Sequence, residues 1–299
     1  MTGRSIPDIP TLRAICHRGK LEKDRRPWYA GFRKMAIYIT WLLIHTGITA
    51  NQVTLLSVFL SVAGTLLLAM PAAWLALCGA SAFLAHHLLD KVDGDIARFR
   101  KTFSIVGVYL DEVGHGLAFA GIFLGLGLHL AWGARTAGEA ILVLGAASIG
   151  ALSMVLARQN KSAGFLVFAQ YVLVQPALLP DRGTAASPHL FSRDAVHRSR
   201  RGEAGEAQGA GAEILTGLRD SVLLLSDFTV ILLLVLVGLV IELFHGQVAF
   251  LRVVLVAGAI LQATVLLALI WINYSTNVET ECLRLNALLK SRDRRTRDE

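Results

Sequence analysis

Long apolar runs alternate with short basic connections along the chain, and this pattern predicts a bundle of membrane-spanning helices. Six runs reach about 20 residues, the length that crosses the hydrocarbon core of a bilayer. They cover residues 52–70, 73–99, 105–131, 138–157, 221–244 and 248–272. The alternation of apolar and polar residues that a transmembrane β-barrel needs is absent from the sequence. We therefore expect an all-α integral membrane protein with six transmembrane helices.

A shorter apolar run precedes the first predicted span and differs from it in composition. Residues 28–46 mix Trp28, Tyr38 and Trp41 with arginine and lysine, and their continuous apolar part is too short to span a bilayer. Aromatic and basic residues together are typical of a helix that lies at the level of the lipid headgroups. We expect an in-plane amphipathic helix here rather than a seventh span.

The distribution of lysine and arginine predicts how the spans are oriented. Basic residues gather before the first span, in the turn between the second and third, after the fourth, and in the C-terminal tail. The connections on the opposite side hold one basic residue, Arg135. Cytoplasmic segments of membrane proteins carry the excess of positive charge. Both termini are therefore expected on the cytoplasmic side, in the bacterial inner membrane or an equivalent membrane.

Composition also indicates a membrane protein, and it divides the chain into three segments. Of its 299 residues, 54% are hydrophobic and 17% are charged, whereas soluble domains are about a quarter charged. The net charge of +7 sits beside apolar spans, which indicates attraction to anionic lipid rather than to nucleic acid. We expect a basic N-terminal segment (1–25), a membrane domain (26–275) with an interfacial helix after residue 158 and a flexible cytoplasmic loop (181–219), and a basic tail (276–299).

Four side chains that can bind metal lie where the second and third predicted spans meet. Asp90 and Asp93 are three positions apart and share one helix face, while Asp111 and His115 are four apart and share another. The tight basic turn between these spans makes them antiparallel, so the four side chains can converge. Ionisable residues at membrane depth are costly and usually functional. Ion pairing within the bundle is a poor explanation, because three acids with Arg98 as their nearby cation would be badly balanced.

These carboxylates repel one another in a low dielectric, and a divalent cation bound between them would offset the repulsion. Oxygen ligands favour Mg²⁺ or Mn²⁺, and such ions commonly clamp phosphate oxygens during displacement at phosphorus. Gly94, Ala97 and Gly107 leave helix faces on which an anionic ligand can approach the backbone. Arg98 is expected to meet a phosphate or to lie at the headgroup level. Gly121 and Gly125 have the spacing of helix-packing residues.

The spacing of these residues resembles the signature of the CDP-alcohol phosphotransferase family, which reads DxxDGxxAR, eight residues, then GxxxDxxxD. Seven positions are filled with the spacing intact, by Asp90, Asp93, Gly94, Ala97, Arg98, Gly107 and Asp111. The stretch TGITANQVTLLS before the first span and GLRDSVLLL at 217–225 also resemble the family, although Ala50 stands where a proline is common. The resemblance extends over residues 26–275.

The resemblance implies a six-helix enzyme, commonly a homodimer, with its active site open to the cytoplasm. Such an enzyme cleaves a CDP-linked lipid or another CDP-alcohol and transfers the phosphoalcohol to an acceptor hydroxyl, releasing CMP. It implies one or two divalent ions among the aspartates, with the nucleotide beside Asn51 and Thr54, which could equally cap the first span. Arg219 and Asp227 could contact the acceptor, or could serve as a membrane-boundary anchor and a structural hydrogen-bond partner.

The last signature position is usually an aspartate assigned as the general base, and here it is His115. Three interpretations stay open. His115 can be the base, since the ordinary pKa of histidine, about 6.5, suits proton abstraction near neutrality. It can be a neutral metal ligand beside the aspartates. It can also mark a site that binds CDP-lipid and metal but has lost the usual transfer.

Another class of enzyme also remains open. Other metal-dependent diphosphate transferases of membranes, such as prenyltransferases, use aspartate-rich motifs on two separate helical hairpins. The sequence contains one such hairpin. The neighbouring histidines, His86 and His87, are expected to be packed in the bundle, although His86 lies one turn before Asp90 and could hydrogen-bond it.

Overall fold

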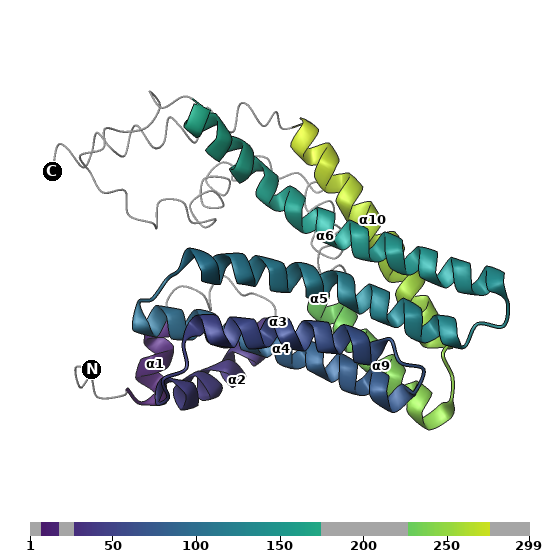
Figure 1. Ribbon diagram of the computed structural model, residues 1–299, viewed down its shortest axis with the longest axis horizontal. Helices are drawn as coiled ribbons and strands as arrows, with labels where there is room; N and C mark the ends of the chain where they lie inside the picture. Colours follow the sequence, from purple (N-terminus) through teal and green to yellow (C-terminus); the bar gives the residue numbers. More distant parts are fainter. Residues whose placement is uncertain (1–6, 18–26, 175–226, 276–299) are drawn as a thin grey trace, which may run out of the picture. The chain divides into compact units, whose positions relative to one another are not determined.

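The computed structural model describes residues 7–17, 27–174 and 227–275, and these residues fold into eight α-helices (Figure 1). The helices are α1 (Ile9–Cys16), α2 (Pro27–Ile44), α3 (Ala50–Leu68), α4 (Ala73–Arg100), α5 (Ile105–Trp132), α6 (Ala137–Val174), α9 (Phe228–His245) and α10 (Ala249–Ser275). All regular structure in the described residues is helical, as the sequence predicted. The predicted loop at 181–219 and the tail from 276 lie outside these residues.

Five helices of the described residues are long and apolar enough to cross a membrane, which supports a multi-pass membrane protein. Their apolar segments are Ala50–Leu68, Ile105–Trp132, Ala137–Asn160, Phe228–His245 and Ala249–Trp271. They correspond to five of the six predicted spans. Helix α4, the predicted second span, has 28 residues but is not among the five. Its C-terminal half carries the histidines and aspartates of the signature region, so the sixth span stays a prediction.

Two local predictions need correction. Helix α6 continues without a break to Val174, although the sequence suggested that the fourth span ends near residue 157 and that a separate interfacial helix follows. Polar residues such as Arg158 are tolerated in a helix, and no proline interrupts the chain before Pro176. Helix α1 lies in a segment expected only to be basic. Its start is marked by Asp8, whose side chain accepts a hydrogen bond from the Thr11 N–H at 3.3 Å.

The chain divides into two compact units, one made of Met1–Val155 and Phe228–Ile260, the other of Leu156–Asp227 and Leu261–Glu299. In the first unit, α4 packs against α1, α2, α3, α5 and α9, and α3 also packs against α5 (Figure 1). One core of this unit is built around Phe83, Ile122 and Leu126. A smaller core joins α1, α2, α3 and the C-terminal half of α4. Helix α4 is therefore the central element of this unit.

A tight connection sets the geometry of α4 and α5. Helix α4 ends at Arg100 and is capped by Lys101, which adopts a left-handed conformation with φ of 57°. Helix α5 begins at Ile105, and the hydroxyl of its N-cap, Ser104, accepts a hydrogen bond from the Gly107 N–H at 2.9 Å. Helix α3 begins with a capping box between Thr49 and Gln52, so Thr49 and not Asn51 or Thr54 is its N-cap. The signature residues of α4 and α5 consequently face each other.

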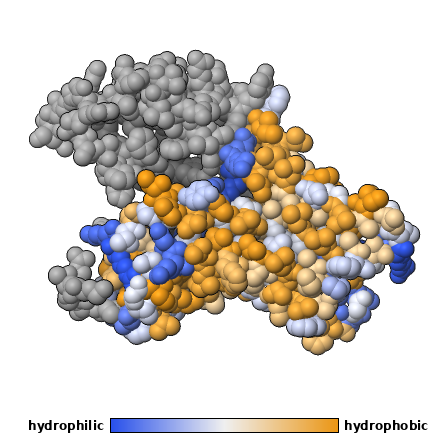
Figure 2. Space-filling view, in the orientation of Figure 1, coloured by the Kyte–Doolittle hydropathy of each residue, from blue (hydrophilic) through white to orange (hydrophobic). Residues whose placement is uncertain are grey.

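Large apolar side chains lie exposed along the helices, as a lipid environment requires. On α3, Leu55, Phe59 and Leu66 are 57%, 66% and 60% exposed. Figure 2 shows apolar residues over much of the visible surface, with hydrophilic residues gathered in a few clusters. Soluble monomers rarely expose apolar patches of this extent. The surface therefore agrees with the membrane class that the apolar runs predict.

Glycines let the helices of this bundle approach closely. As the spacing predicted, Gly121 and Gly125 lie against α3: added Cβ atoms there would meet the side chain of Thr65 and, at 3.0 Å, its carbonyl oxygen. The tightest backbone approach involves Gly79 of α4. A Cβ at this position would fall 2.6 Å from the carbonyl oxygen of Gly64 and 2.8 Å from the Cα of Leu68. Close packing of α3 on α4 thus depends on a hydrogen side chain at Gly79.

Replacing Gly79 by alanine is expected to destabilise the protein. The obstructing atoms are backbone atoms, so α3 and α4 must move apart, at a cost of about 1–3 kcal/mol in free energy of unfolding. Thermal unfolding of the detergent-solubilised protein measures the effect. Gly145→Ala is the matched control, because a Cβ there meets nothing within 4 Å. Equal unfolding midpoints for the two variants would contradict this account of the packing.

Candidate active site

A polar cavity of about 300 Å³ lies among the N-terminal part of α3, the C-terminal half of α4 and the N-terminal part of α5. It is lined by nine of the residues that the sequence singled out: Asn51, Thr54, Asp90, Asp93, Gly94, Ala97, Arg98, Gly107 and Asp111. Its size is at the lower end of the range for small-molecule sites. The local spacing of the signature therefore did predict which side chains meet.

His115 lies beside this cavity, next to two of the aspartates. Side-chain ligand atoms of Asp90, Asp111 and His115 all fall within 4.8 Å of one another. The Nδ1 atom of His115 is 2.9 Å from the Asp111 carbonyl oxygen and 3.3 Å from its Oδ1, and Nε2 is 3.5 Å from Asp90 Oδ1. With its proton on Nδ1, the ring donates to the Asp111 carbonyl. Nε2 is then the nitrogen with a lone pair, and it faces Asp90.

Asp93 is held separately from this trio. It is mostly buried, and its Oδ2 accepts a hydrogen bond from the Thr54 hydroxyl at 2.6 Å. The sequence suggested that Thr54 contacts the nucleotide or caps a helix. The structure adds a different contact, which fixes the orientation of a carboxylate that lines the cavity. A hydroxyl from α3 thus positions an acidic group of α4.

The floor of the cavity at the start of α5 is made by a small hydrogen-bonded group. The Ser104 hydroxyl donates to Asn51 Oδ1 at 2.9 Å while it caps α5 through the Gly107 N–H. A Cβ on Gly107 would fall 2.7 Å from Asn51 Oδ1 and 3.0 Å from Ser104 Oγ. In this structure, Gly107 therefore makes room for the Asn51 side chain. The cap of α5 and this floor of the cavity depend on the same glycine.

Three cations line the cavity together with its three aspartates. Lys91 forms an ion pair with Asp90. Arg98 folds back over Gly94, whose Cβ would lie 3.2 Å from Arg98 Nη1. Arg33 reaches the cavity from α2 and is mostly buried. Three positive and three negative side chains in one cavity suit an anionic ligand that binds together with a metal cation.

Two of these cations were not recognised from the sequence. Arg33 was grouped with the basic residues of a headgroup-level helix, and nothing in the local pattern distinguishes it from Lys34. Lys91 was overlooked although it follows Asp90 directly. The position of Lys91 directly after a signature aspartate could have predicted this ion pair, because buried carboxylates are usually paired with a cation.

The acidic side of the cavity fits a divalent metal ion. Two carboxylates and an imidazole come within 4.8 Å of one another, and a third carboxylate lines the same cavity. Hard oxygen ligands of this kind suit Mg²⁺ or Mn²⁺, and one nitrogen ligand is compatible with either. The ammonium of Lys91 already places a positive charge on Asp90. The residues present therefore match the chemistry that such an ion requires.

Four other residues that the sequence singled out, Arg219, Asp227, His86 and His87, are not among the described residues that line this cavity. Arg219 lies outside the described residues, and Asp227 is a half-buried residue of the second unit directly before α9. Their acceptor-binding roles stay predictions. His86 does not pair with Asp90; its Nδ1 is 2.9 Å from the Ser57 carbonyl oxygen. His87 is packed, with its ring against Phe32 and its Nε2 3.3 Å from the Thr229 hydroxyl.

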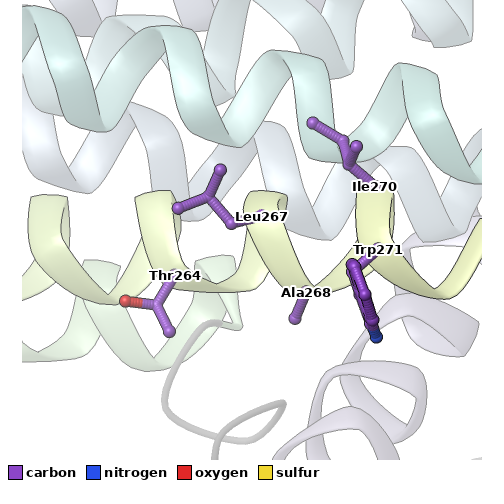
Figure 3. Close-up of a pocket in the computed structure, with 5 residues that line it drawn as sticks. All are labelled: Thr264, Leu267, Ala268, Ile270 and Trp271. Carbon is purple, nitrogen blue, oxygen red and sulfur yellow. The ribbon is translucent and has the colours of Figure 1, made fainter. Parts of the chain in front are cut away.

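A second hollow, of about 610 Å³, runs along α10 and is lined by Thr264, Leu267, Ala268, Ile270 and Trp271 (Figure 3). One hydroxyl and the indole nitrogen are the polar side-chain atoms among these five residues. Such a surface cannot hold a metal ion or a diphosphate. The smaller polar cavity is therefore the candidate active site.

Comparison with known proteins agrees with this site. Residues 47–190 match the model of the CDP-alcohol phosphatidyltransferase family, and this segment contains α3, α4 and α5 in full. No curated protein matches the chain. The match confirms the resemblance noted in the signature and identifies residues 47–190 as those of a CDP-alcohol phosphatidyltransferase family enzyme. The family is metal-dependent, in agreement with the acidic cluster.

Substituting Gly107 tests the described floor of the cavity. In Gly107→Ala the new methyl group must displace Asn51 or Ser104, so we expect CDP to bind about tenfold more weakly, as measured by calorimetry. Gly116→Ala on the same helix meets nothing within 4 Å and serves as the matched control. Equal CDP affinities for these two variants would show that Asn51 and Ser104 do not shape the site.

Proposed function

We propose that the protein transfers the phosphoalcohol of a CDP-linked lipid to an acceptor hydroxyl and releases CMP, as a step in phospholipid synthesis. Family membership implies CDP-alcohol phosphotransferase activity. The observation that carries the proposal is the cavity in which three aspartates and three cations face one another within an apolar helix bundle. A diphosphate needs both groups: cations to contact its oxygens and carboxylates to hold a metal on it.

The rim of the cavity favours a lipid donor over a soluble one. Phe103 and Val108 line the cavity and are 64% and 69% exposed. Ile105, between them, is 89% exposed. Apolar side chains beside a polar cavity suit a ligand with a charged headgroup and acyl chains, because both parts then find matching surroundings.

Asp90, Asp93 and Asp111 would hold one or two Mg²⁺ or Mn²⁺ ions. Such an ion supplies Lewis-acid stabilisation of the negative charge on the diphosphate. Thr54 orients Asp93, and Lys91 balances the charge of Asp90. On the other side of the cavity, Arg33 and Arg98 are available to contact phosphate oxygens. Gly94 leaves room for the Arg98 guanidinium that lies over it, and Ala97 adds only a methyl group to the lining of the cavity.

We assign His115 as the general base that takes the proton of the acceptor hydroxyl. Its Nδ1 contact with the Asp111 carbonyl oxygen fixes the ring and leaves Nε2 for the proton. The 3.5 Å between Nε2 and Asp90 Oδ1 would also allow the two groups to share a metal ion. Both roles need the same nitrogen, so they exclude each other. Experiment can therefore separate them.

The proposed orientation puts the cavity on the cytoplasmic side of the membrane. Basic residues gather at this end of the first unit, including Arg33, Lys34, Arg98, Arg100 and Lys101. This agrees with the rule that cytoplasmic ends carry positive charge. We further propose that the enzyme acts as a homodimer, as members of its family commonly do.

Release of CMP tests the proposed reaction. The purified protein in mixed micelles is incubated with CDP-diacylglycerol, Mn²⁺ and a panel of alcohols, and CMP is quantified by chromatography. We expect CMP release with at least one acceptor and its abolition by Asp93→Asn. A wild-type protein that binds CDP and Mn²⁺ but is inert with every donor and acceptor would support the alternative of an inactive family member.

The role of His115 is tested by His115→Ala. If His115 is the base, turnover should fall by about 10²–10⁴-fold while Mn²⁺ binding stays within about twofold of wild type. His45→Ala is the control, since His45 is an exposed histidine at the end of α2. A parallel loss of Mn²⁺ affinity would instead identify a metal ligand. Increased activity in His115→Asp would indicate a site that has drifted from the usual reaction.

A further inference from the structure

Asp95 is a buried carboxylate that the family signature does not specify. It lies between Gly94 and Ala97, is fully buried, and does not line the cavity. One of its oxygens accepts from Arg98 Nη2 at 2.5 Å, and the other lies 3.1 Å from Nε2 of His17. Burying a carboxylate is costly unless it is paired and hydrogen-bonded. Asp95 therefore joins a cavity-lining arginine to a residue near the start of the chain.

His17 is brought to Asp95 by helix α1. Leu12 and Cys16 of this helix are essentially inaccessible and share a core with Ile37 of α2 and Val92 and Ile96 of α4. The Cys16 thiol donates to the Asp95 carbonyl oxygen at 3.4 Å. An eight-residue helix is too short to be stable alone, so α1 depends on this docking.

The other partner of Asp95, Arg98, faces the cavity. Arg98 lines the cavity, and its guanidinium lies over Gly94, as the 3.2 Å approach of a Cβ there to Nη1 indicates. An arginine side chain has many rotamers, and ordering it costs conformational entropy. The Asp95 contact at Nη2 fixes one edge of the planar guanidinium while the side chain lines the cavity. Such an arginine is prepared to contact an anion.

We propose that His17 and Asp95 form a positioning pair through which helix α1 orients Arg98 toward the phosphates of the CDP donor. The inference rests on the proposed function, because it takes the diphosphate as the ligand of the cavity. His17 does not line the cavity and acts through Asp95, so it is a positioning residue. The family match begins at residue 47, so His17 and α1 lie outside the matched segment, whereas Asp95 and Arg98 lie within it.

The test measures how His17 affects binding of the donor phosphates. In His17→Leu the contact with Asp95 is lost, and we expect CDP affinity, measured by calorimetry with the full-length protein in detergent and Mn²⁺, to fall about tenfold. In kinetics the KM for the CDP donor should rise while the KM for the acceptor stays unchanged. His17→Gln keeps an N–H donor for Asp95 and should restore affinity to within about twofold of wild type.

Two further variants guard against a loss of folding. Asp95→Asn keeps the shape of the side chain but removes its charge, and should weaken CDP binding as His17→Leu does. In the double variant His17→Leu/Arg98→Ala the effects should not add, since both act on one guanidinium. His45→Leu is the matched control, since His45 is an exposed histidine directly after α2 whose ring contacts Trp41 of that helix.

Other outcomes would overturn the proposal in recognisable ways. If His17→Leu binds CDP as wild type does, α1 does not position Arg98. If it lowers the unfolding temperature and impairs donor and acceptor KM alike, or if its effect adds to that of Arg98→Ala, the contact serves packing only. Wild type that binds CDP without releasing CMP refutes the proposed reaction and leaves the positioning pair testable by affinity. Wild type that fails to bind CDP refutes both.

Discussion

The fold of the first unit depends on holding three carboxylates together at one end of an apolar bundle. Asp90, Asp93 and Asp111 line one cavity, and like charges at such distances repel strongly where water is scarce. The surrounding structure offsets this repulsion with a lysine on Asp90, a hydroxyl on Asp93 and a tight turn that fixes α5 against α4. A divalent ion bound by these carboxylates would offset the remaining negative charge. The glycines, caps and buried cations of this region serve the same arrangement.

The sequence predicted the contacts between site residues that lie three or four positions apart on one helix or on either side of one tight turn. Asp90 and Asp93 on one helix, and Asp111 and His115 on the next, meet because a short basic turn separates the helices, and each step follows from helix geometry. Contacts between distant segments were not predictable in this way. His17 and Asp95 are 78 positions apart, and no local pattern connects them. Apolar runs likewise predicted the helices but not the continuation of α6.

His115 stands at the one signature position where this chain departs from the family pattern. An aspartate offers two oxygens and can bind metal with one while it accepts a proton with the other. With Nδ1 against the Asp111 carbonyl oxygen, His115 offers a single nitrogen for either task. Arg98 lines the cavity and also contacts Asp95, which in turn contacts His17 directly after α1. Of these contacts, His17 and Asp95 lie at positions that the short signature does not specify.

Metal binding by the aspartates tests the central claim most directly. Mn²⁺ titration of the purified protein, followed by electron paramagnetic resonance, should reveal bound ions in wild type, and Asp90→Asn and Asp111→Asn should weaken binding by more than about tenfold. Glu112→Gln is the matched control, because Glu112 adjoins Asp111 but points about 100° away around the helix. The account predicts wild-type affinity for that control. Mn²⁺ binding that is absent in wild type, or unchanged in the aspartate variants, would contradict it.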